Sequence, residues 1–274
     1  MDRVWLITGA SSGFGRSIAE AALAAGDYVV AGVRRPAAVA DLVSAHPDRV
    51  LALELDVTDS SRIPAAVAET VGWRGRIDVL VNNAGYALVG AVEENTDAEL
   101  RGMLEVMFFG AAALVRAVLP HMRGQGSGAI VQISSLGGQL SFAGYSAYSA
   151  AKFALEGLSE ALADEVKPFG IKVLIVEPGN FRTNLQNGFA VSTPIAAYQD
   201  TVGATVRNAA ASDGTQAGDP AKAASAIVAA LDAEDSPLRL PLGNDAVDLL
   251  LAHSDRFRAE LATWEKVSRG TDFD

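Results

Sequence analysis

Ser135, Tyr148 and Lys152 lie close together in the sequence and carry side chains that could transfer a proton. The run of Ala, Leu and Glu after Ala147 predicts a helix, on which Tyr148 and Lys152 lie one turn apart on the same face. An ammonium group beside a phenol favours the phenolate, so we expect the pKa of Tyr148 to lie below its ordinary value of roughly 10. Tyr148 could then donate or accept a proton near neutral pH, while Ser135 holds a substrate oxygen. The alternative is an ordinary pair of residues on a helix surface.

A glycine-rich turn near the N-terminus predicts a binding site for phosphate. Residues 4–8 form an apolar run typical of a strand buried on both faces, and a helical pattern follows that ends at Gly26. Glycines between them let the backbone approach a pyrophosphate, whose charge is bound by the N–H groups and positive dipole end of the helix. The residues expected to form this turn are Gly9, Ser11, Ser12, Gly13, Phe14 and Gly15.

Further motifs follow along the chain. After TGASSGFG at 8–15 come LDVTD at 55–59, NNAG at 82–85, ISS at 133–135, YSAAK at 148–152 and PGNFRT at 178–183. In these motifs, their order and their separations, the chain resembles the short-chain dehydrogenase/reductase family from the N-terminus to about residue 183. The final third resembles it only loosely. The resemblance implies an oxidoreductase that uses a nicotinamide dinucleotide, with Ser135, Tyr148 and Lys152 as catalytic residues.

Apolar runs and helical patterns alternate along the chain with short links. We expect strands at 4–8, 28–33, 50–55, 77–81, 129–133, 172–176 and 238–240, and a long helix from about Asp97 to Leu119 that ends near Pro120. This alternation predicts an α/β fold with a doubly wound, mostly parallel, Rossmann-like sheet of about seven strands and helices on both faces. We interpret residues 1–274 as one domain. Within it, 1–125 mainly bind the cofactor, 126–183 are catalytic, 184–219 form a substrate lid and 220–274 form C-terminal helices.

Composition argues against several other classes of protein. The formal charge of −11 does not suit binding to nucleic acid or to an anionic membrane, because either partner requires a basic surface. The chain has no cysteine, and its three histidines lie far apart, so we expect neither a disulfide nor a metal site. We also expect no signal peptide and no apolar run approaching the roughly 20 residues that span a bilayer. A cytoplasmic protein is the resulting expectation.

Residues at the ends of the predicted strands are expected to bind the cofactor, because ligands of open α/β sheets bind outside the carboxyl ends of the strands. Arg34 and Arg35 follow the second strand, where no carboxylate is present. This favours the 2′-phosphate of NADP(H) over the ribose diol of NAD(H), with two surface arginines as the alternative. The resemblance implies further contacts with adenine, ribose and nicotinamide by Asp56, Val57, Asn83, Ala84, Gly85, Pro178, Gly179, Phe181 and Thr183, together with Tyr148 and Lys152.

Met107 departs from the family's pattern. Family members usually carry an asparagine in this register of the long helix, where it helps to hold a water that links the active-site lysine to solvent. A thioether is only a weak acceptor and donates nothing, although the backbone carbonyl of Met107 could still bind the water. We therefore expect hydride transfer to survive and proton supply to be slowed or rerouted.

The substrate is the least determined part of this interpretation. Residues 184–219 resemble the family's mobile lid, and their apolar side chains, with Leu136, Phe142 and Tyr145, indicate a moderately hydrophobic carbonyl or alcohol. Core packing explains any one of them equally well. A helix at 246–267 would cover the pocket or meet another subunit, and the resemblance implies a homodimer or homotetramer.

Three functions fit the sequence. The first is an NADP(H)-dependent oxidoreductase that interconverts a carbonyl and an alcohol on a small molecule. The second is a nucleotide-binding sensor or scaffold without turnover, which Met107 would favour. The third is a non-redox enzyme, such as a dehydratase or epimerase, that uses the same Tyr148 and Lys152.

Overall fold

A parallel β-sheet forms the centre of the protein. The computed structural model describes residues 2–183 and 189–273. The sheet has seven strands in the order β3-β2-β1-β4-β6-β7-β9, and every neighbouring pair is parallel. The strands are β1 (Val4–Thr8), β2 (Tyr28–Val33), β3 (Val50–Glu54), β4 (Val79–Asn82), β6 (Gly128–Ile133), β7 (Ile171–Pro178) and β9 (Arg239–Leu242). This confirms the predicted sheet, whose order reverses between β1 and β4, the place where such folds bind ligands.

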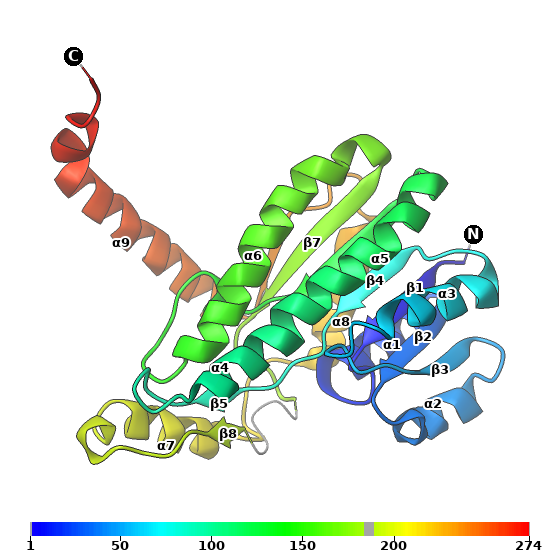
Figure 1. The fold of residues 1–274 in the computed structure, drawn as a ribbon, viewed down its shortest axis with the longest axis horizontal. Coiled ribbons are helices and arrows are strands. Elements are labelled where there is room, and N and C mark those ends of the chain that lie inside the picture. The colour runs from blue at the N-terminus through cyan, green and yellow to red at the C-terminus, as the bar shows by residue number, and fades with distance from the viewer. Residues whose placement is uncertain (1, 184–188, 274) are drawn as a thin grey trace.

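Helices cover both faces of the sheet (Figure 1). α1 (Gly13–Ala24), α2 (Ala40–Ala45) and α8 (Pro220–Asp232) pack on one face, and α3 (Ile63–Arg74), α5 (Gly110–Gln125) and α6 (Ser146–Val166) pack on the other. Successive residues of a strand point to opposite faces of the sheet. Trp5 and Ile7 pack in the hydrophobic core between the sheet and α1, α2 and α8, and Val4 and Leu6 pack in the core on the other face. Because the strands are buried on both faces, they appear in the sequence as continuous apolar runs.

The predicted long helix contains a π-helical turn and extends further than expected. α4 (Asp97–Leu104) leads through a π turn at Glu105–Phe109 into α5. The expected end near Pro120 was wrong, because α5 continues to a left-handed cap at Gly126, where φ is 67°. Pro120 cannot bond to the carbonyl of Arg116, but both residues are exposed, so water can bind that carbonyl.

The helical run over Asp97–Gln125 is long and apolar enough to cross a membrane by length and composition alone. The expectation that no apolar run approaches this length was therefore wrong, since the helix continues past Pro120. A buried helix of a globular core has the same composition, and Leu114, Val118 and Met122 of this run are buried in the core. Packing against the sheet thus accounts for the apolar character of these three residues.

A second, two-stranded sheet and a helix beside it were not predicted. β5 (Leu88–Val89) and β8 (Ala190–Val191) form a small parallel sheet, and α7 (Val202–Ser212) lies nearby (Figure 1). The C-terminal helix α9 (Asn244–Arg269) confirms the helix expected at 246–267. It projects away from the sheet, and nearly all its residues after Ala246 are exposed (Figure 1).

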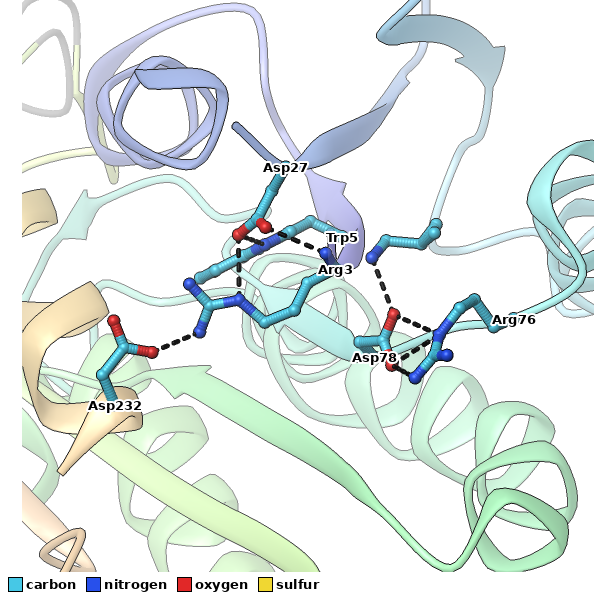
Figure 2. A network of polar contacts seen from close by, with 7 residues as sticks. Arg3, Trp5, Asp27, Arg76, Asp78 and Asp232 are labelled. Atoms are coloured by element: carbon cyan, nitrogen blue, oxygen red, sulfur yellow. Dashed lines mark hydrogen bonds and ion pairs between the residues drawn. The ribbon is translucent and has the colours of Figure 1, made fainter. Parts of the chain in front are cut away.

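Asp27 ties the start of the chain to the amino edge of the sheet (Figure 2). It is 5% exposed and accepts hydrogen bonds from the backbone N and Nε of Arg3, both at 2.9 Å, and from Nε1 of Trp5 at 2.8 Å. Arg3 also donates to Asp232, at the end of α8, at 2.7 Å. This network joins β1, β2 and a helix of the first face.

Asp78 forms the neighbouring contact at the same edge (Figure 2). It is 7% exposed and accepts a hydrogen bond from the backbone N of Val4 at 2.8 Å. The guanidinium of Arg76 binds both of its carboxylate oxygens at 2.6–2.9 Å. The negative charge of Asp78 is therefore matched by an arginine and a backbone donor.

Candidate active site

The carboxyl edge of the sheet opens into a cleft of about 620 Å³. This volume lies in the range typical of small-molecule and cofactor sites. The cleft brings together Ser135, Tyr148, Lys152 and Met107 with most residues expected to bind the cofactor, namely Gly9, Ser11, Ser12, Gly13, Phe14, Arg34, Asp56, Val57, Asn83, Ala84, Gly85, Pro178, Gly179, Phe181 and Thr183. Two expected residues, Gly15 and Arg35, do not line it.

The glycine-rich turn has a shape that depends on glycine. Gly9 has a φ of 65° and Gly13 a φ of 55°, in the left-handed region. A Cβ on Gly15 would lie 2.4 Å from the carbonyl oxygen of Gly9, so Gly15 allows the helix to approach the turn from behind and does not face the cleft. α1 begins here without a side-chain cap, which leaves its first N–H groups for an anion.

Thr8 joins the glycine-rich turn to the segment 82–85. Its hydroxyl accepts hydrogen bonds from the backbone N of Asn83 at 2.9 Å and of Ala84 at 3.0 Å, and donates to the carbonyl of Val81 at 3.2 Å. The side chain of Asn83 donates in return to the carbonyl of Thr8 at 2.9 Å. No role was expected for Thr8 from the sequence. The one sequence feature that could have indicated such a role is that Thr8 places a hydroxyl at the end of a buried strand.

The two arginines after β2 differ in position. Arg34 lines the cleft, and no ion pair within residues 2–183 and 189–273 includes it. Both arginines are exposed; Arg35 precedes the short 3-10 helix Pro36–Val39 and does not line the cleft, and its role in binding the cofactor stays a prediction. On the cleft floor, Asp56 accepts hydrogen bonds from the backbone N of Thr58 at 2.9 Å and from its hydroxyl at 2.8 Å.

Tyr148 and Lys152 lie in the first turns of α6, with Ser135 just after β6. Lys152 is 5% exposed, and its Nζ donates to the carbonyl of Ile133 at 2.7 Å and lies 5.7 Å from the Tyr148 ring centroid. The Ser135 hydroxyl accepts a hydrogen bond from the backbone N of Gly137 at 3.0 Å, and Ser135 lines the same cleft as Tyr148. The predicted juxtaposition of phenol, ammonium and hydroxyl is therefore present.

The expected direction of the Tyr148 pKa was wrong. Although Tyr148 is partly exposed through the cleft, burial of its surroundings raises its pKa to about 12, and the hydrogen bond with Ser135 lowers it only in part. The ammonium of Lys152 is directed at the Ile133 carbonyl and does not offset that burial. Burial also lowers the pKa of Lys152 to about 8, against the opposing effect of the negative charge on Glu156. Near neutral pH, Tyr148 is thus a neutral phenol and Lys152 is mainly charged.

Met107 lies beside the lysine, as the register of the motif predicted. It is 2% exposed, belongs to the π turn, and lines both the main cleft and a small adjoining cavity of about 10 Å³ that Lys152 also lines. A Cβ on Gly85 would lie 3.2 Å from its sulfur. A thioether therefore occupies the position where members of the family usually carry the amide of an asparagine. The position lies in a π turn, a feature that often marks functional sites.

The segment 178–183 closes over the glycine-rich turn. The rings of Phe14 and Phe181 lie 5.1 Å apart at 57°. A Cβ on Gly13 would lie 3.4 Å from Cβ of Thr183. The start of α9 supports this segment, because Asp245 accepts from the backbone N of Asn180 at 2.7 Å. Two stretches far apart in sequence thus form opposite walls of the cleft.

A cluster of apolar side chains packs next to Tyr148. The ring of Tyr145 lies 6.2 Å from that of Tyr148, at 68°. Tyr145 packs in a cluster with Val89, Val202 and Phe189. This cluster, called the apolar wall below, connects the start of α6 to the segment that was expected to form a lid.

Part of the expected lid, residues 184–188, lies outside the described residues. The rest contacts the loop after β5. The hydroxyl of Tyr198 donates to Glu93 at 2.7 Å, and the backbone N of Ile195 donates to Glu94 at 2.6 Å. Together with the pairing of β5 and β8, these contacts hold the segment beside the apolar wall.

Comparisons with known proteins agree with this geometry. The model of the short chain dehydrogenase family matches residues 3–192. The chain belongs to the short-chain dehydrogenase family. A solved short-chain dehydrogenase from Streptomyces avermitilis is 61% identical to this short-chain dehydrogenase, with a TM-score of 0.94 and coverage of 100% of both chains.

Two further relatives bear on chemistry and cofactor. The oxidoreductase BOA17 of Botryotinia fuckeliana (strain B05.10) is 40% identical over 270 residues, 98% of each chain. A solved 3-ketoacyl-(acyl-carrier-protein) reductase from Brucella melitensis, complexed with NADH, is 25% identical, with a TM-score of 0.73 and coverage of 88% of this chain and 96% of that one. This short-chain dehydrogenase is an oxidoreductase of a family that binds nicotinamide cofactors, and its uncapped helix terminus and glycine turn fit such a dinucleotide.

Proposed function

We propose that this short-chain dehydrogenase is an NADP(H)-dependent oxidoreductase that interconverts a carbonyl and an alcohol on a moderately hydrophobic small molecule. The observation that carries the proposal is the meeting of Ser135, Tyr148 and Lys152 in the same cleft as the glycine-rich turn. When bound, the nicotinamide supplies or accepts the hydride. The residues of the chain bind the reacting oxygen and move its proton.

Tyr148 is suited to donate a proton. Because its pKa is about 12, it is a neutral phenol at pH 7 and can give its proton to the oxygen of a carbonyl as that oxygen gains negative charge. Ser135 lines the cleft with the phenol and would bind the same oxygen. The buried ammonium of Lys152 supplies positive charge beside the phenolate that remains. This favours the reductive direction.

Arg34 supports the choice of NADP(H). A 2′-phosphate needs cationic donors, and Arg34 lies on the cleft without an ion-pair partner among the described residues. Arg35 is no part of this argument, because it does not line the cleft. Support for a moderately hydrophobic substrate comes from the apolar cluster of Tyr145, Val89 and Val202, which packs next to Tyr148.

The test follows the absorbance of NADPH, with NADH in parallel, on mixing the protein with a panel of aromatic and aliphatic ketones and aldehydes. We expect turnover with NADPH preferred. Arg34→Ala should raise the KM for NADPH roughly 10- to 100-fold, the cost of one or two charged hydrogen bonds, and leave the KM for NADH nearly unchanged. Arg35→Ala is the matched control and should change both values little. Equal use of both cofactors by the wild type would exclude the NADP(H) preference.

A further inference from the structure

Two buried glutamates, one on α6 and one on β7, lie outside the cleft. Glu156 is 5% exposed and lies one turn after Lys152 on α6, and Glu177 is 0% exposed near the end of β7. One arginine faces both: Nε of Arg239 lies 3.2 Å from Oε2 of Glu156 and 3.3 Å from Oε1 of Glu177. The same arginine reaches Glu160, which is 63% exposed, at 3.5 Å.

The sheet register places these residues together. β7 pairs with β9 so that Ile175 lies beside Arg239, and residues 175 and 177 point to the same face of β7. On that strand Leu174 and Val176 face α1 and α8, which leaves Glu177 on the face of α6. The three charged residues thus come from three elements that meet only in the folded chain.

The pair has more negative charge than its surroundings balance. Arg239 supplies one positive charge for the two carboxyl groups, and Gln139 donates a hydrogen bond to Glu177. One oxygen of each glutamate, Oε1 of Glu156 and Oε2 of Glu177, is buried without a hydrogen-bond partner. Two buried carboxylates that share a single arginine are unfavourable when both are ionised, and one proton held by the pair would remove the excess negative charge. Burial raises the pKa of Glu177 to about 7 and also raises that of Glu156.

The pair also acts on the proposed catalytic lysine. Lys152 and Glu156 are four residues apart on α6, and the charge of Glu156 opposes the loss of the lysine's proton. The charge on the pair is therefore felt at the active site.

We propose that Glu156 and Glu177 share one proton and that this shared proton sets how firmly Lys152 holds its charge, which makes the pair positioning residues for catalysis. The role in catalysis rests on the proposed function, whereas the shared proton does not. Loss of the shared proton as pH rises adds a negative charge near Lys152 and keeps the lysine charged to higher pH. The other charged groups that face the pair are Arg239 and the exposed Glu160.

The first test is independent of activity. An acid whose pKa is raised on folding contributes stability that is present below its ordinary value of 4.5 and is lost as pH rises through about 7. Glu177→Gln mimics the protonated acid at every pH. Its melting temperature, compared with that of the wild type, should therefore rise between pH 5 and pH 8. Glu160→Gln removes an exposed charge from the same arginine and should show no such trend.

The second test measures kcat against pH with saturating cofactor. Glu177→Gln carries less negative charge near Lys152 at high pH than the wild type does, so Lys152 should lose its proton at lower pH. The alkaline loss of activity should therefore begin at lower pH, by on the order of half a pH unit to one unit. Glu160→Gln should leave that limb in place. If Glu177→Gln does not fold, Glu156→Gln takes its place, because it also leaves a single carboxyl group.

The outcomes separate the two parts of the proposal. A flat difference in melting temperature between pH 5 and 8 overturns the shared proton, whether or not the protein reduces carbonyls. A pH-dependent difference without any movement of the alkaline limb overturns the action on Lys152. A pH-dependent difference in melting temperature together with a shifted alkaline limb of kcat supports the proposal. Absence of turnover in the wild type counts against the oxidoreductase function and leaves the melting test valid.

Discussion

At the amino edge of the sheet, Asp27 and Asp78 are buried with an arginine and backbone donors for each carboxylate, whereas at the carboxyl edge the buried groups have fewer partners than they need. Lys152 has one carbonyl acceptor, and the Glu156–Glu177 pair shares one arginine. At the amino edge, the charge of each buried carboxylate is balanced by its own arginine and backbone donors, and these contacts join strands. The arrangement at the carboxyl edge leaves protonation states that depend on the surroundings, which suits a site that must move a proton.

Tyr148→Phe should have the largest effect of the changes that test this comparison. Removal of the hydroxyl takes away the proton donor, so kcat should fall by roughly 10²- to 10⁴-fold while the melting temperature stays nearly the same. Steady-state reduction of the best ketone measures it. Tyr145→Phe, a change in the neighbouring ring, is the control and should lose far less. Comparable losses in both variants would refute a special role for Tyr148.

Asp78→Ala should have the largest effect at the amino edge, and on stability rather than on rate. It leaves the Val4 N–H and the Arg76 guanidinium without their acceptor, and Arg76 is only partly exposed. Breaking such a buried pair costs about 3 kcal/mol in the free energy of unfolding. Urea unfolding measures this cost, and kcat per folded molecule should not change. A large loss of kcat with intact stability would mean that the two edges are not separate in function.

Met107→Asn should raise kcat by roughly 3- to 10-fold, because an amide beside Lys152 would restore a hydrogen-bonding group for proton supply. The pH dependence of kcat should change with it. Met107→Leu also lacks an amide and should show no gain. An unchanged rate and pH profile in Met107→Asn would rule out any handicap from the methionine and remove the main support for a protein without turnover.

Asp232→Asn should have the smallest effect. Asp232 is 58% exposed where it meets Arg3, so solvent screens this ion pair. The free energy of unfolding should change by less than about 0.5 kcal/mol. The same urea titration used for Asp78→Ala provides the comparison. A loss as large as that of Asp78→Ala would show that the network at the amino edge depends on its outer member.

Much of the fold and the site could be predicted from local pattern. Residues 4–8 appear as a strand because they are apolar throughout, and the glycine-rich turn, Tyr148 and Lys152 were found because short motifs fix their spacing. Thr8 was missed because its partners Asn83 and Ala84 lie far along the chain. The end of the long helix was misplaced because proline was expected to stop it, whereas solvent exposure of that turn allowed it to continue.

The sequence by itself determined the order of strands and helices and the family motifs, since each depends on residues close together in the chain. Only the tertiary structure decided which residues lose contact with water. Burial reverses the expected pKa shift of Tyr148, and the folded chain brings Glu156, Glu177 and Arg239 together and places Arg34, but not Arg35, in the lining of the cleft. The physical reason is that the charge state of a group depends on its desolvation and on partners distant in sequence, and neither exists before the chain folds.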